Sequence, residues 1–161
     1  MDYLIQHMLQ TSAARTPDKE ALVHGTERLT YAAVMEKTTG LAHGLREAGL
    51  ARGDRVGIYV EASVQQVLSI FAISKASGVF VPINATLFPE QVAHVANDCG
   101  MKALITTRKK LTSLAEVLSS ITSIEFLVLT EEGEEPQGLP PRIYDFGAFC
   151  DLKPTSNSRE E

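Results

Sequence analysis

The chain has 161 residues, of which 44% are hydrophobic and 22% charged, and its formal net charge is −5. This composition is typical of a globular protein with one domain and a substantial core. The negative charge argues against nucleic-acid binding, which relies on clustered Lys and Arg, and the lack of a signal peptide or of an apolar run of 18 residues predicts a cytoplasmic protein without a membrane span.

The first fifty residues predict a helix, a hairpin and a second helix. Apolar residues at i, i+4 spacing predict a short amphipathic helix over residues 4–14, which stops before a Thr-Pro pair. Two strand-like runs, 21–24 and 28–30, flank a glycine-containing turn and predict a β-hairpin. A further apolar stripe predicts a helix that Thr30 caps and Gly49 closes.

The middle of the chain alternates strands and helices. Three short β-branched runs, bounded by Gly, Pro, Asp or Asn, predict strands over residues 55–60, 79–83 and 103–107. A helical pattern separates each strand from the next. Because parallel strands need right-handed helical crossovers, the predicted fold class is α/β, with a mostly parallel βαβ sheet covered by helices.

The helix after the first of these strands is predicted to be the most buried helix of the chain. Ser63 and Gln66 match a capping box, which places the start of the helix near Val64. Apolar side chains, Phe71 among them, occupy most of its circumference. Further along, Pro82 is expected at a strand end or at a sheet edge, because proline cannot donate to the ladder.

The last third predicts one more helix and one more strand before the pattern fades. Leu and Ile at helical spacing predict a helix over residues 111–121, and residues 126–130 predict a fourth parallel strand. The composition then shifts to Glu, Gly and Pro, which predicts an exposed loop over 131–142. Residues 144–152 predict a short final helix, and 153–161 a flexible tail.

The common catalytic and phosphate-binding motifs are missing from the sequence. It contains neither GxxxxGK[ST] nor GxGxxG, and it has no GxSxG elbow and no HExxH. The residues themselves therefore assign no catalytic, cofactor-binding or metal-binding position.

A few residues can be interpreted in two ways. Glu61 ends a strand on the side where open α/β sheets bind ligands, so it is either a ligand-facing carboxylate or a helix N-terminal charge. The basic run 108–110 is either a solvated loop at a helix entrance or a phosphate-binding cluster. Cys99 is interpreted as a buried structural thiol rather than a nucleophile, and His24 as a loop histidine rather than a metal ligand.

Four segments carry a family resemblance in their order and spacing. They are Leu-Thr-Tyr-Ala at 29–32, Gly-Asp-Arg-Val-Gly-Ile-Tyr at 53–59, Lys-Ala-Ser-Gly-Val-Phe-Val-Pro-Ile-Asn at 75–84, and Leu-Ile-Thr at 104–106. Together they resemble the N-terminal part of adenylate-forming enzymes, which include acyl-CoA synthetases, aryl-CoA ligases, nonribosomal adenylation domains and luciferases. The resemblance covers about residues 3–129.

This sequence departs from the family pattern at two single positions. Ser77 stands where Gly is common, and Ala85 stands where Pro is common.

The resemblance implies that residues 1–152 form a partial N-terminal α/β subdomain of an AMP-forming ligase. The family's phosphate loop, acyl pocket and catalytic Lys belong to positions that follow Glu161. The resemblance therefore assigns this chain no catalytic or nucleotide-binding residue, and it implies ATP, Mg²⁺ and CoA as cofactors of the parent only. Residues 2–9 and 80–84 further resemble the exosortase-associated acyl-CoA ligases.

Two functions from different classes remain open. The leading hypothesis is an N-terminal fragment of an AMP-forming acid:CoA ligase, whose partners would be the remainder of the ligase and its carboxylic acid substrate. The alternative is a free-standing α/β binding or scaffolding module without catalytic activity. Under the first hypothesis the isolated chain is expected to be a homo-oligomer, because a missing neighbour would expose an apolar patch.

Overall fold

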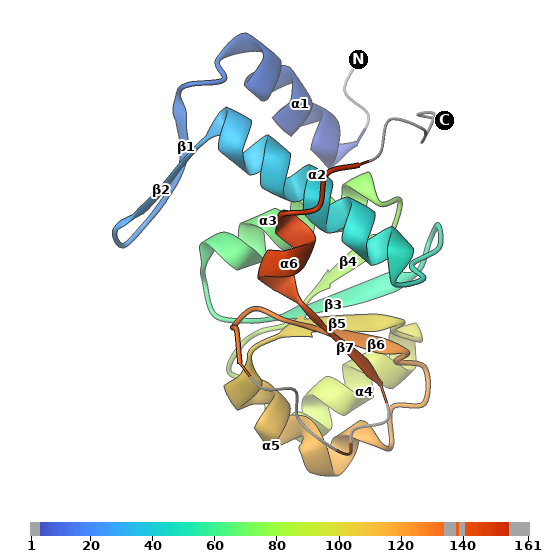
Figure 1. Cartoon of the computed structure of the whole chain (residues 1–161). Coiled ribbons are helices and arrows are strands. Elements are labelled where there is room, and N and C mark those ends of the chain that lie inside the picture. The colour runs from blue at the N-terminus through green and yellow to red at the C-terminus, as the bar shows by residue number, and fades with distance from the viewer. Residues whose placement is uncertain (1–3, 134–137, 139–140, 155–161) are drawn as a thin grey trace.

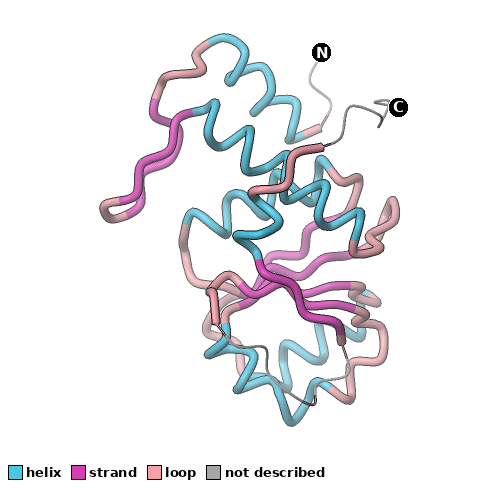
Figure 2. Tube along the Cα trace, in the orientation of Figure 1, coloured by secondary structure: helices cyan, strands magenta, loops and turns pink. Residues whose placement is uncertain are grey.

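The computed structural model describes residues 4–133, 138 and 141–154. Figure 1 shows an α/β body with a central sheet, and Figure 2 shows the same chain coloured by secondary structure. In chain order the elements are α1 (Ile5–Arg15), β1 (Glu20–His24), β2 (Glu27–Thr30), α2 (Tyr31–Glu47), β3 (Arg55–Tyr59), α3 (Val64–Lys75), β4 (Val79–Pro82), α4 (Pro89–Cys99), β5 (Ala103–Thr106), α5 (Arg108–Leu118), β6 (Phe126–Leu129), β7 (Arg142–Asp145) and α6 (Phe146–Cys150).

The central sheet confirms the predicted fold class. Its five strands are all parallel and lie in the order β4-β3-β5-β6-β7. The strand order reverses at β3. After β3 the chain forms β4 on one side of β3, and it then crosses over to form β5 on the other side of β3. Pro82 ends β4, which is an edge strand, as its missing N–H requires.

Helices cover both faces of the sheet (Figure 1). On β6, Phe126 and Val128 pack into the core shared with α2, α3 and α6, whereas Leu127 and Leu129 pack into the core shared with α4 and α5. This alternation is the period of two expected for a strand buried on both faces. The helix α1 and the hairpin β1–β2 lie outside these layers, and α1 packs on α2 and α3.

Helix ends follow the predicted capping residues. The hydroxyl oxygen of Thr30 accepts a hydrogen bond from Ala33 N at 3.2 Å, and that of Ser63 accepts one from Gln66 N at 3.3 Å. At the end of α3, Ser77 has φ +65°, a left-handed conformation that glycine adopts at less cost. The position where the family often has Gly is therefore one that the backbone makes unfavourable for a side chain.

Three arginines tie helix ends along the amino edge of the sheet. The guanidinium of Arg55 donates to Cys99 O at 2.6 Å and Gly100 O at 3.1 Å. Arg46 donates to the carbonyl of Lys75 and Arg142 donates to the carbonyl of Ala48 at 3.0 Å. Each contact satisfies a carbonyl that a helix C-terminus leaves without an intrahelical partner.

The prediction for the C-terminal part was wrong in one respect. A fifth parallel strand, β7, occupies Arg142–Asp145, where a loop end and the beginning of a helix were expected, and α6 is only five residues long. The strand is short and its residues are at most half-buried, so it lacks the continuous apolar run of β5 and β6. Residues 131–133 and 138 are exposed as predicted, while 134–137, 139–140 and 155–161 lie outside the described residues.

The prediction that α3 is the most buried helix holds in part. No residue of α3 is exposed, whereas α2 exposes residues in its first and last turns, but Val67, Ile70 and Phe71 are half-buried rather than buried. The burial predicted for Cys99 was wrong. Cys99 is half-buried rather than buried, and Cys150 is the buried thiol. The apolar composition of α3 indicated a helix surrounded by protein on all sides, but among the described residues one side of α3 is covered only partly.

The contact between α2 and α6 depends on two glycines four residues apart. A side chain at Gly40 would meet the backbone carbonyls of Phe149, Cys150 and Leu152, and one at Gly44 would meet the Phe149 ring. Glycine inside a helix is unfavourable by about 1 kcal/mol relative to alanine, so its use here reflects the close approach of α6. The sequence pattern predicts a helix through both positions and carries no sign of this contact.

Thr38 provides a test of the α2 packing. Its side chain is fully buried, and Oγ1 has no hydrogen-bond partner in the described structure. We expect Thr38→Val to leave the free energy of unfolding unchanged or to raise it by about 1 kcal/mol, because it removes an unsatisfied polar group at nearly constant shape. Urea denaturation measures the change.

The neighbouring Thr39→Val is the matched control. The Thr39 hydroxyl donates to Met35 O at 2.8 Å and the residue is half-buried, so we expect a change within about 0.5 kcal/mol. A clear loss of stability in Thr38→Val would show that the buried hydroxyl is satisfied in solution.

Candidate functional site

The carboxyl edge of the sheet beside β3 and β5 is the first place to look for a site. In open α/β sheets, ligands bind outside the carboxyl ends of the strands where the strand order reverses. Here that point carries Tyr59, the last residue of β3, and Glu61 just after it. Lys110, in the first turn of α5, reaches the same point.

The Lys110 ammonium is held from three directions. It donates to Ala85 O at 2.7 Å, lies 3.0 Å from Glu61 Oε1, and lies 4.5 Å from the centroid of the Tyr59 ring. Its side chain is 14% exposed, whereas that of Glu61 is 72% exposed. An ammonium has three N–H donors, and these contacts engage it with groups of its own chain. Lys110 therefore joins α5 to neighbouring segments.

The same cluster fixes the loop between β4 and α4. The Tyr59 hydroxyl donates to Leu87 O at 2.8 Å, and the Thr106 hydroxyl donates to Tyr59 O at 2.8 Å. Lys110 and Tyr59 thus hold two carbonyls of the loop that follows the sheet edge. The crossing point of the sheet is filled by these side chains, so they position a loop there.

Both ends of the basic run 108–110 are engaged with carbonyl groups. The Arg108 guanidinium donates to Gly133 O at 2.7 Å and to Glu131 O at 3.3 Å. The run therefore lies at a helix entrance, as interpreted from the sequence, but its first and last residues dock neighbouring segments. Sequence reasoning missed the pairing of Lys110 with Glu61 and the role of Tyr59. The sequence places all three residues near the carboxyl ends of parallel strands, but it carries no signal for the contact between them.

The remaining candidates lie apart from this cluster. His24 is exposed at the end of β1. Burial raises the pKa of the Cys150 thiol to about 12, against the opposing influence of Lys37, so this thiol stays protonated near neutral pH. Within the described residues, no three His, Cys, Asp or Glu side chains are grouped to hold a metal ion, and no helix is long and apolar enough to cross a membrane.

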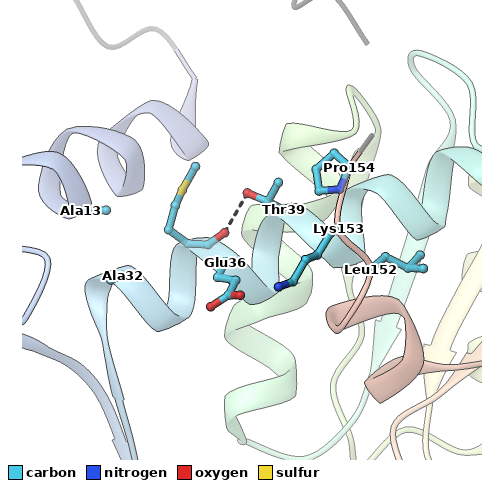
Figure 3. A pocket seen from close by; sticks show the side chains of 8 residues that line it. Ala13, Ala32, Glu36, Thr39, Leu152, Lys153 and Pro154 are labelled. Carbon is cyan, nitrogen blue, oxygen red and sulfur yellow. Dashed lines mark hydrogen bonds between the residues drawn. The ribbon is translucent and has the colours of Figure 1, made fainter. Parts of the chain in front are cut away.

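A hollow of about 590 Å³ lies on the far side of α2 from the sheet. It is open to solvent, and Ala13 of α1 and Met35 of α2 line it together with residues 152–154 (Figure 3). Glu36 and Lys153 also contribute to its walls. It shares no residue with the Lys110 cluster, so the hollow and the sheet edge are separate features.

Comparison with known proteins identifies the family. The model of the family described as AMP-binding enzyme matches residues 9–148. The chain belongs to this family. It is 35% identical to tyrocidine synthase 2 of Brevibacillus parabrevis over 80% of this chain and 3% of that protein. It is 29% identical to the medium/long-chain-fatty-acid–CoA/3-oxocholest-4-en-26-oate–CoA ligase of Mycobacterium marinum over 74% of this chain and 22% of that ligase.

The fold also matches a solved ligase. The crystal structure of coronafacic acid ligase from Pectobacterium brasiliense superposes with a TM-score of 0.87 at 17% identity, over 98% of this chain and 31% of that one. This AMP-binding chain thus has the fold of the N-terminal domain of adenylate-forming ligases. It spans less than a third of the length of each of these relatives.

Two of the cations that could bind a nucleotide phosphate are engaged with this chain. Arg108 and Lys110, in the basic run, donate to carbonyl groups. We expect titration calorimetry of the 161-residue chain with Mg-ATP, and with CoA, to show no saturable heat. A saturable heat at micromolar ligand would contradict this prediction.

Proposed function

We propose that this chain is the N-terminal subdomain of an AMP-forming acid:CoA ligase and that it lacks the phosphate loop and the catalytic residues of that enzyme. The parent joins a carboxylic acid to ATP, forming an acyl-adenylate and releasing pyrophosphate. It then transfers the acyl group to the CoA thiol and releases AMP. The match of the AMP-binding family model over residues 9–148 is the observation that carries the proposal.

The role of this chain within the parent is structural. Its cations hold its own loops and helix ends, and its buried thiol is protonated, so the described residues provide a framework. ATP, Mg²⁺ and CoA are then cofactors of the parent, the remainder of the ligase is its partner, and the cytoplasm is its compartment. The narrower resemblance to exosortase-associated ligases stays a prediction.

One of the comparisons favours a second kind of acceptor for the acyl group. Tyrocidine synthase 2 is a relative at 35% identity, so the acyl group of the parent could pass to a thiol on a carrier protein instead of CoA. The first half-reaction is the same for both acceptors. The free-standing α/β module without activity remains the alternative from another class.

The experiment is to express the protein encoded by the reading frame that contains this chain and its downstream continuation. We expect pyrophosphate exchange into ATP that depends on an added carboxylic acid, and none from the 161-residue chain. Supplying CoA or a carrier protein then separates the two acceptors. A stop codon directly after Glu161 would contradict the ligase and favour the free-standing module.

We also propose that the isolated chain self-associates. Val67 and Phe71 on α3 are half-buried, and Val79 on the adjoining edge strand is 48% exposed, so apolar surface lies uncovered there. Backbone pairing at this edge is restricted. Val79 N donates to Asp54 O just before β3, and Ile83 N donates to Ile58 O of β3, so the backbone groups of Phe80 and Pro82 point away from β3. Of these two residues, Pro82 has no N–H to offer to another chain.

Light scattering after size exclusion tests the self-association. We expect a mass above 17.5 kDa that falls on dilution, because apolar contacts rather than a continuous ladder hold the copies together. A mass near 17.5 kDa at all concentrations would show that the subdomain covers its own core, and it would favour the free-standing module.

A further inference from the structure

The side of α2 that faces away from the sheet carries much of the exposed apolar surface. Leu4 and Met8 of the α1 region are 52% and 61% exposed, and Val23 of β1 and Leu152 after α6 are also exposed. Among the large hydrophobic side chains that are exposed in the described residues, these four lie on the outer elements. The other two are Val79 and Phe88.

Helix α1 has apolar residues both on its buried side and on its exposed side. Gln6 and Leu9 are buried against the body of the protein, and Gln6 is hydrogen-bonded to Ser74 of α3. Leu4 and Met8 are four residues apart and therefore share a side, which lies away from Leu9. A helix with apolar residues on two sides is typical of one packed between two neighbours. Among the described residues, the helices that α1 packs on are α2 and α3, on the side of Gln6 and Leu9.

The hollow beside α1 is preformed. Ala32 and Met35 of α2, Ala13 of α1, and Leu152 and Pro154 line it, so most of its wall is hydrocarbon (Figure 3). Residues 151–154 are fixed against α2 because Gly40 admits the carbonyls of Phe149 and Leu152, each of which would lie 2.8 Å from a side chain added there. Glu36 and Lys153 add an acid and a base to the wall.

We propose that the outer surface, formed by Leu4 and Met8, the hollow and residues 151–154, is covered in the intact ligase by the part of that ligase that lies outside this sequence. The proposal rests on the proposed function. Two observations select this occupant. The chain spans 22% and 31% of two ligases that it resembles, so most of such a protein lies outside the matched segment and can pack against it. Residues 152–154, the last residues that the structure describes, themselves line the hollow.

The test compares Met8→Glu in two contexts, the 161-residue chain and the intact ligase. In the chain, Met8 is exposed, so we expect the thermal midpoint to change by no more than about 1 °C. In the intact ligase the new carboxylate would be buried without a partner, so we expect the midpoint to fall by at least about 4 °C. Met8→Leu, which keeps an apolar side chain, should restore the midpoint in the ligase.

Phe88→Glu is the matched control, because Phe88 is 71% exposed and lies at the start of α4 on the opposite face of the sheet. We expect its effect on the midpoint to be the same in the chain and in the ligase. Equal midpoint shifts for Met8→Glu in the two contexts would overturn the proposal.

Two further results distinguish this proposal from a contact between two copies of the protein and from a failure of the proposed function. Conversion of an oligomeric intact ligase to monomers by Met8→Glu would assign the surface to a second copy and would also overturn the proposal. The midpoint comparison requires no catalysis. A stable intact protein without acid-dependent pyrophosphate exchange would therefore count against the proposed function alone.

Discussion

The burial of both faces of the parallel sheet is the constraint on which the rest of the structure depends. All four residues of β5 and of β6 are buried. Each of these strands therefore carries apolar side chains on both faces of the sheet, and each face of the sheet needs its own layer of helices. Gly57 at the centre of β3 shows how tightly this face of the sheet is packed. A side chain there would overlap Met101, which follows α4, and Leu104 of the neighbouring strand β5. The helices consequently have to end close to the sheet edges, where their terminal backbone groups need partners.

Cationic side chains meet that need at both edges of the sheet. Along the amino edge, arginines such as Arg55 bind the last carbonyls of neighbouring helices. At the carboxyl edge, Lys110 binds a loop carbonyl while it packs on Tyr59. A guanidinium offers five donors in a fixed fork and can bind several carbonyls at once, whereas an ammonium is a compact charge that fits a small enclosed site. These cations stabilise the framework, so their presence at the carboxyl edge is no sign of phosphate binding.

The sequence predicted the parts of the fold that depend on local pattern. Strands β3, β5 and β6 and the caps Thr30 and Ser63 were readable because burial on two faces and capping each leave a short-range pattern. β7 was missed because an edge strand needs only partial burial, and its partner β6 is what makes it a strand. The incomplete burial of Phe71 was missed because composition shows that a helix is apolar, and it does not show how fully its neighbours cover each side chain.

The site could be predicted even less well, for the same physical reason. The contact of Lys110 with Glu61 and Tyr59 joins residues from two separate strand ends, and no spacing in the sequence encodes it. Similarly, Gly40 is unremarkable in the sequence until the carbonyls of α6 are seen against it. Local pattern specifies which elements form, whereas the side chains that join elements depend on how the elements are placed.

The segment 75–84, which carries the strongest family resemblance, has a physical explanation that involves no chemistry. Ser77 adopts a left-handed conformation after α3, and Gly78 lies where a side chain would come within 3.0 Å of Ile73. Pro82 removes an outward donor from the edge strand, and the Asn84 side chain accepts a hydrogen bond from Thr86 N at 3.0 Å. The segment is therefore a tight turn, a protected sheet edge and a loop cap. A fingerprint of this kind identifies a family through its framework, because the residues that carry it shape the backbone.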